Sequence, residues 1–139
     1  YSIALPGAEW DEAAFLAEVL ERTGCGLLLD VTNLYTNAIN LKYDWREFLA
    51  RLPLERVVQL HFTGGHRRHG MLVDSHSQRT PEEVWQVLEA VLERAPVKGA
   101  ILELDENLPP FADLLAEVAR AREIGRRHGR WGSSACKAC

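Results

Sequence analysis

The stretch from Gly26 to Asp105 decides the fold, because it contains three short apolar runs that end in polar residues. The runs read G-L-L-L-D over residues 26–30, R-V-V-Q-L-H over residues 56–61 and G-A-I-L-E-L-D over residues 99–105. Short apolar runs bounded by turn residues are typical of strands that are buried on both faces of a sheet. We therefore predict three buried strands, over residues 26–31, 56–62 and 97–104.

Four segments outside these runs show helical signals: apolar residues at helical spacing, capping boxes and prolines in the first turn. The predicted helices cover residues 10–22, 44–52, 80–95 with Thr80 as the N-cap, and a segment that begins after Pro109-Pro110. One apolar face of the last helix is formed by Phe111, Leu114, Leu115 and Val118. Residues 33–40, with three asparagines, and residues 63–79, rich in Gly and His, are predicted to be loops.

Strands that alternate with helices through such connections predict an α/β fold with parallel strands and right-handed crossovers. With 139 residues, the chain is too short for a closed (β/α)8 TIM barrel of about 250 residues. We predict a partial TIM barrel of about three to four β/α units over residues 1–130, and a small open three-layer sandwich is the alternative. Residues 131–139 are predicted to be a disordered tail, and the abrupt start at Tyr1 predicts truncation.

The composition excludes several classes of protein. An apolar fraction of 47% and a charged fraction of 26% are average for a soluble globular domain. A formal charge of −4 argues against nucleic-acid binding, and no run of 18 apolar residues or signal pattern indicates a membrane span or export. The sparse cysteines, Cys25, Cys136 and Cys139, do not resemble a disulfide framework, which predicts a cytoplasmic location and leaves the role of Cys136 and Cys139 open.

A residue that can bind a metal lies at the end of each predicted strand: Asp30, His61 and Glu103. Because the carboxyl ends of parallel strands share one edge of the sheet, these side chains are expected to meet there. Asp74 and His76 add a second pair, since residues i and i+2 of an extended segment point the same way. A mixture of imidazole and carboxylate suits iron, manganese or zinc. We predict a metal site formed by these five residues.

Each of these residues also has an ordinary explanation. Asp30 could cap a helix or a turn, and His61 could be a satisfied core histidine. Asp74 and His76 could be ordinary polar residues of a surface loop, and Glu103 could belong to a solvated edge. His66, beside two arginines, is a candidate for contact with a substrate. The prediction of a metal site therefore depends on all the residues meeting at one point.

The same residues carry a resemblance to a known family. The matching text is found in residues 25–40, 52–66, 72–76 (L-V-D-S-H) and 101–109. In this text the sequence resembles the multinuclear non-haem iron-dependent oxidative enzymes, which include the methanobactin-biosynthesis iron enzyme. The resemblance implies a xylose-isomerase-like TIM barrel that holds two or three irons. It implies that the five residues above are iron ligands and that Asn33 and Asp105 lie beside them.

The resemblance also implies an activity: dioxygen-dependent modification of cysteine or other side chains in ribosomally made peptides, often with a partner protein that delivers the peptide. The family's chains are about twice as long as this one, so we expect the C-terminal half of such an enzyme, with its partner either a second copy or a missing N-terminal half. The alternatives are a sugar isomerase or epimerase that uses divalent manganese, magnesium or zinc, and an inactive fragment that serves as an interaction module.

Overall fold

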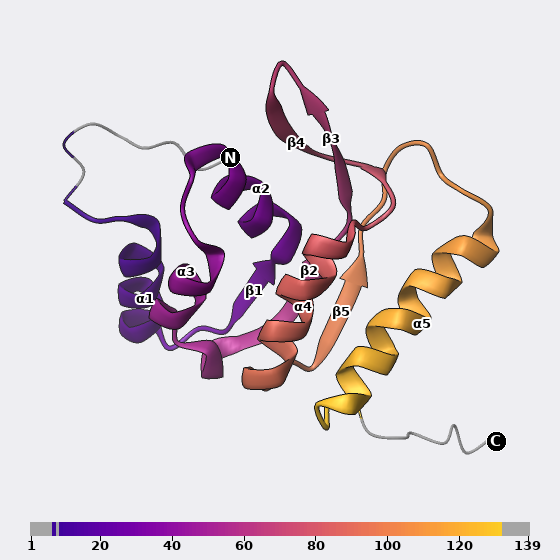
Figure 1. Ribbon diagram of the computed structural model, residues 1–139. Helices are drawn as coiled ribbons and strands as arrows, with labels where there is room; N and C mark the ends of the chain where they lie inside the picture. Colours follow the sequence, from indigo (N-terminus) through magenta and orange to yellow (C-terminus); the bar gives the residue numbers. More distant parts are fainter. Residues whose placement is uncertain (1–6, 8, 132–139) are drawn as a thin grey trace.

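The computed structural model describes residue 7 and residues 9–131 (Figure 1). Its helices are α1 (Glu12–Thr23), α2 (Val31–Leu41), α3 (Trp45–Arg51), the short 3-10 turn η1 (Leu54–Arg56), α4 (Glu82–Arg94) and α5 (Phe111–Arg127). Its strands are β1 (Leu27–Asp30), β2 (Val57–Phe62), β3 (Gly64–Arg68), β4 (Met71–Gln78) and β5 (Gly99–Leu102). No helix in the described ranges is long and apolar enough to cross a membrane. The predicted tail, with Cys136 and Cys139, lies outside the described residues except for Trp131.

Strands β1, β2 and β5 form a parallel sheet in the order β1-β2-β5. The prediction of an α/β fold with parallel strands is therefore confirmed, and the arrangement is compatible with part of a barrel. Strands β3 and β4 form a separate antiparallel hairpin. This hairpin stands above the carboxyl ends of the parallel strands (Figure 1).

Helices α2 and α4 lie over one face of the sheet and contact β2 (Figure 1). The side chains on this face are Leu29, Leu60 and Phe62, which are buried. They pack with the buried apolar residues of the helices, which include Leu34, Val84, Leu88 and Val91. Burial of such side chains stabilises a fold by about 1.5–3 kcal/mol each, so this layer is the core of the molecule.

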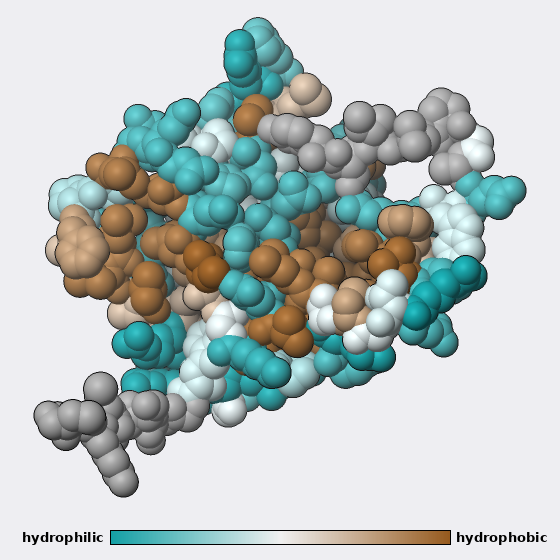
Figure 2. Space-filling model, turned by 180° about the vertical axis from the view of Figure 1, so that it is seen from behind, coloured by the Kyte–Doolittle hydropathy of each residue, from teal (hydrophilic) through white to brown (hydrophobic). Residues whose placement is uncertain are grey.

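The other face of the sheet is open. Leu28 on β1 is 45% exposed and Ile101 on β5 is 44% exposed, whereas their neighbour Leu29 is buried. Seen from behind, apolar side chains gather across the middle of this face (Figure 2). The prediction that the strands are buried on both faces is therefore wrong, because none of the described helices covers the second face.

Residues 33–40, predicted to be a loop, belong to helix α2. Asn and β-branched residues have low helix propensity, which favoured the loop prediction. Packing overrides this preference, because Val31, Leu34 and Ala38 recur at helical spacing and are all buried. The three asparagines supply polar contacts to one another and to β4.

Residues 63–79, also predicted to be a loop, form most of the β3–β4 hairpin. The prediction failed because β3 reads G-G-H-R-R and shows no alternation of apolar and polar residues. The two glycines are required by close backbone contact: a Cβ on Gly64 would lie 2.0 Å from the carbonyl oxygen of Arg79, and a Cβ on Gly65 would lie 2.0 Å from that of Val73. The backbone of β4 and of Arg79, the residue that follows it, therefore explains the pair.

Two details of the C-terminal helices also differ from expectation. Helix α4 has Pro81 as its N-cap, and the Thr80 hydroxyl instead donates to Glu117 Oε2 at 2.6 Å. On α5, the predicted apolar face is largely open, since Phe111 is 71% exposed and Leu115 is 52% exposed. The buried residues of α5 are Ala121, Ile124 and Gly125. The N-terminal half of α5 therefore presents apolar side chains that the described chain does not cover.

Candidate metal centre

The strand ends meet at one edge of the sheet, as parallel pairing requires. Asp30, the last residue of β1, pairs with His61 in β2, and His61 pairs with Ile101 in β5. Glu103 follows two residues later on the same side, with its backbone N–H donating to the carbonyl oxygen of Phe62 at 3.1 Å. The residues from three separate runs of sequence therefore lie next to one another.

A bulge in β4 brings in the second pair of residues. Between the register pairs Gly64–Gln78 and His66–Val73, β3 advances by two residues and β4 by five. The extra residues include Asp74 and His76, and His76 has a left-handed backbone with φ of 49°. Its carbonyl oxygen accepts from the backbone N–H of Asp105 at 2.8 Å. A bulge that redirects side chains, and not a regular extended segment, thus carries Asp74 and His76 to the edge.

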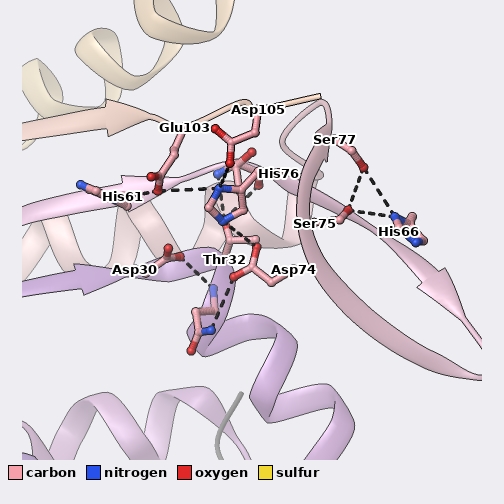
Figure 3. Close-up of polar contacts among 12 residues, drawn as sticks. Asp30, Thr32, His61, His66, Asp74, Ser75, His76, Ser77, Glu103 and Asp105 are labelled. Atoms are coloured by element: carbon pink, nitrogen blue, oxygen red, sulfur yellow. Dashed lines mark hydrogen bonds and ion pairs between the residues drawn. The ribbon is translucent and has the colours of Figure 1, made fainter. Parts of the chain in front are cut away.

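Asp30, His76 and Glu103 form the centre of the cluster. One possible ligand atom from each residue lies within 4.8 Å of the others, which is close enough for all three to hold one ion (Figure 3). His61 joins through Nδ1, which lies 2.9 Å from Glu103 Oε2. Asp74 joins through Oδ1, which lies 3.4 Å from His76 Nε2. Each of the five predicted ligand residues therefore lies close to at least one other member of the cluster. Their binding of a metal stays a prediction.

Two buried atoms of the cluster lack hydrogen-bond partners. These are Asp74 Oδ1 and His76 Nδ1. His76 Nδ1 does lie 3.1 Å from Asp105 Oδ2, but the contact is not aligned as a hydrogen bond. A buried polar atom left without a partner costs about 1–3 kcal/mol, so it is unusual to find two in one cluster. Within the described chain no Lys or Arg forms an ion pair with these carboxylates either. The donor set fits a divalent transition metal such as iron, manganese or zinc.

His61 and Asp30 are each placed to bind a metal ion, and each also makes a hydrogen bond within the protein. An ionised carboxylate can only accept, so in the neutral imidazole the contact with Glu103 favours the tautomer with the proton on His61 Nδ1 and the lone pair on Nε2. Asp30 is the N-cap of α2, and its Oδ1 accepts from the backbone N–H of Asn33 at 2.8 Å. The ordinary explanation of Asp30 as a cap is therefore correct, and a carboxylate oxygen of the same residue still lies within 4.8 Å of the ligand atoms of His76 and Glu103.

The predicted neighbours of the site fall in two places. Asn33 Nδ2 donates to Asp74 Oδ2 at 3.5 Å, and Asp105 lies beside His76. His66 lies apart from the cluster, on the far side of the hairpin, with Nδ1 2.8 Å from Ser75 Oγ (Figure 3). Asn33 and Asp105 are thus placed to orient ligands, whereas His66 contacts none of the five.

Burial raises the pKa of both Asp30 and Asp74 above the ordinary aspartate value, in each case because desolvation penalises the charged form. The folded state therefore holds these protons more tightly than the unfolded state. The free energy of unfolding then falls as pH rises from about 4 through the raised pKa of the folded protein. Without a bound cation, the negative charges of the cluster oppose folding at neutral pH.

We expect Asp74→Asn to stabilise the metal-free protein at pH 7 by about 1 kcal/mol, because the amide keeps the shape and removes the buried charge. The gain should shrink toward pH 4, where the wild-type carboxylate takes up its proton. Urea unfolding of both proteins at the two pH values measures this. Asp44→Asn, which changes an exposed N-cap to another good cap, is the matched control and should be neutral. A wild type more stable than Asp74→Asn at pH 7 would contradict the expectation.

Two supporting contacts escaped the sequence-based prediction. The Thr32 hydroxyl donates to the carbonyl oxygen of Thr63 at 2.9 Å and accepts from its N–H at 2.8 Å, which ties the start of α2 to the end of β2. Asn40 makes a similar pair of bonds to Leu72 of β4. The spacing of Asn33, Asn37 and Asn40 is helical, and that signal could have revealed both the helix and its polar side.

Comparisons with known proteins show the family of this chain. The family model of the RiPP precursor modification enzyme MbnB/TglH/ChrH matches residues 1–126. The chain belongs to this family. RiPPs are ribosomally made peptides that are modified after translation, and the family description names enzymes that modify their precursors.

Several curated proteins are similar in sequence to this chain. A UPF0276 protein of Chromobacterium violaceum is 44% identical over 122 residues, which cover 88% of this chain and 44% of the relative. A UPF0276 protein of Caulobacter vibrioides is 45% identical over 120 residues, covering 85% and 43%. One of Bordetella pertussis is 48% identical over 115 residues, covering 79% and 40%. The chain thus spans less than half the length of these relatives.

Proposed function

We propose that this chain carries most of a multinuclear non-haem iron site that serves the oxidation of peptide side chains, with cysteine thiols as the substrate groups. The observation that supports this most is the meeting of Asp30, His76 and Glu103 within 4.8 Å at one sheet edge. The family description supports a modified peptide as the substrate. The parallel β/α order, with a match to less than half of each relative, supports a partial (β/α)8 barrel that is part of a longer enzyme, and the resemblance in the sequence favours its C-terminal half.

Each side chain of the cluster would have a distinct role in such a site. Iron, when bound, would supply redox chemistry with dioxygen, which no amino-acid side chain provides. Asp30, Asp74 and Glu103 would hold the cation and balance its charge. His61 would bind through Nε2 while Glu103 keeps the proton on Nδ1. A peptide thiol would be placed next to the ion at the sheet edge where these residues meet.

Anaerobic loading with Fe²⁺ tests the proposal. We expect the desalted protein to retain at least one iron per chain and to show a visible band that changes on exposure to air. A cysteine-containing peptide added before air should change in mass. These results depend on dioxygen, so an anaerobic sample carried through the same steps is the control.

Other outcomes favour the alternatives. Tighter binding of manganese or zinc than of iron, with no response to air, would favour an isomerase or epimerase of the same barrel class. Absence of any bound metal after loading would leave an interaction module as the explanation. Either result would contradict the proposed oxidation.

A further inference from the structure

Asn40, in the last turn of α2, makes two hydrogen bonds to the backbone of one residue in β4. Its Nδ2 donates to the carbonyl oxygen of Leu72 at 2.9 Å, and its Oδ1 accepts from the N–H of Leu72 at 2.9 Å. A strand residue exchanges the same two bonds with its partner in an antiparallel ladder. The side chain of Asn40 therefore pairs with β4 in the way that a neighbouring strand would.

This pairing lies close to the candidate metal centre. Leu72 precedes Asp74 by two residues, and Asp74 and His76 both lie in the β4 bulge. At the other end of α2, Asp30 caps the helix and Asn33 contacts Asp74. The start of α2 thus carries the candidate ligand Asp30. Near its end, the helix is hydrogen-bonded to β4, the strand that carries Asp74 and His76.

The hairpin depends on such attachments. A two-stranded hairpin is marginally stable by itself, and this one stands away from the sheet (Figure 1). Its other backbone contacts to the body include the bonds from Asp105 and Glu106 to the carbonyl oxygen of His76. The Asn40 pair fixes the strand before the bulge, and the Asp105 bond fixes the bulge itself. Together they determine where Asp74 and His76 point.

We propose that Asn40 is a positioning residue for the metal centre, acting by clamping β4 so that the bulge presents Asp74 and His76 to Asp30 and Glu103. The link to metal rests on the proposed function, whereas the clamp does not. An amide is required because one end must donate and the other accept. Aspartate at this position has no donor and would place a carboxylate against the Leu72 carbonyl oxygen. Alanine would remove both bonds.

The test uses Asn40→Asp and Asn40→Ala in the full chain, with Gln78→Glu as the control. Gln78 is an exposed residue at the end of the same strand, so its substitution makes the same amide-to-acid change away from the clamp. In the metal-free protein, amide hydrogen exchange should become about tenfold faster in residues 71–78 and stay unchanged in α4 and β2. In titrations with Zn²⁺ and Fe²⁺, affinity should fall by about 10- to 100-fold, as for other residues that orient ligands. The control should change neither measurement.

The two readouts separate the possible failures. Unchanged exchange in residues 71–78 of both variants would overturn the clamp. Faster exchange with unchanged metal affinity would overturn the positioning role. A wild type that binds no metal would defeat the proposed function and the positioning role together, while the exchange measurement would still decide whether the clamp exists. A thermal unfolding scan of each variant confirms that the core is folded before the readouts are compared.

Discussion

Replacement of His76 by alanine is expected to lower the affinity of the chain for Fe²⁺ and Zn²⁺ by more than about 100-fold, beyond the loss typical of residues that only orient ligands. His76 lies at the centre of the cluster, within 4 Å of three carboxylates. Its imidazole lies 3.4 Å from Asp74 Oδ1, 3.8 Å from Glu103 Oε2 and 3.1 Å from Asp105 Oδ2. Without it, the clustered carboxylates keep only His61, at the Glu103 side of the cluster, as a nitrogen donor.

The matched control is His66→Ala. His66 lies on the same hairpin, is exposed and contacts Ser75, not the five clustered residues. Anaerobic titration followed by desalting and metal analysis should show loss of metal for His76→Ala and retention for His66→Ala. Equal behaviour of the two variants would contradict the site.

A second variant guards against misfolding of the hairpin. His76 has a φ of 49°, a region that alanine adopts reluctantly and asparagine more readily. His76→Asn should therefore keep the bulge and still lose the imidazole. If this variant keeps the far-UV spectrum and the unfolding midpoint of the wild type but binds no metal, the loss is due to the ligand and not to the fold.

Self-association is the second large effect that we expect. On the open face of the sheet, Leu28 and Ile101 are nearly half exposed, and on α5 the exposed fractions are 71% for Phe111, 52% for Leu115 and 38% for Val118. Contiguous apolar surface of this kind usually marks an interface, and β1 and β5 are open sheet edges within the described chain. We expect a second copy of the chain to cover this surface.

Light scattering at micromolar concentration should report a mass above that of the monomer. The double variant Phe111→Ser and Leu115→Ser should shift the protein toward the monomer, because it removes apolar side chains from the open part of α5 without touching the buried Ala121 and Ile124. Met71→Ser is the control, since Met71 is 58% exposed at the hairpin and separate from that surface. A monomeric wild type would contradict the expectation.

Much of the fold could be predicted because its causes are local. Apolar runs set β1, β2 and β5, and Asp11, Gly24 and Asp44 cap helices close to the predicted boundaries. Parallel pairing then follows from the alternation of elements, and it forces the strand ends to one edge. For this reason Asp30, His61 and Glu103 could be placed together from their positions in the sequence.

The tertiary structure alone decided the rest. Helix α2 forms in spite of its asparagines because Val31 and Leu34 are buried against other elements, which no local preference can show. The bulge that carries His76 depends on contact between the backbones of β3 and β4 at Gly65 and on a bond from Asp105. The sequence by itself determined which residue types reach the sheet edge. Long-range packing decided how the hairpin is held above it, because those contacts join residues that lie far apart along the chain.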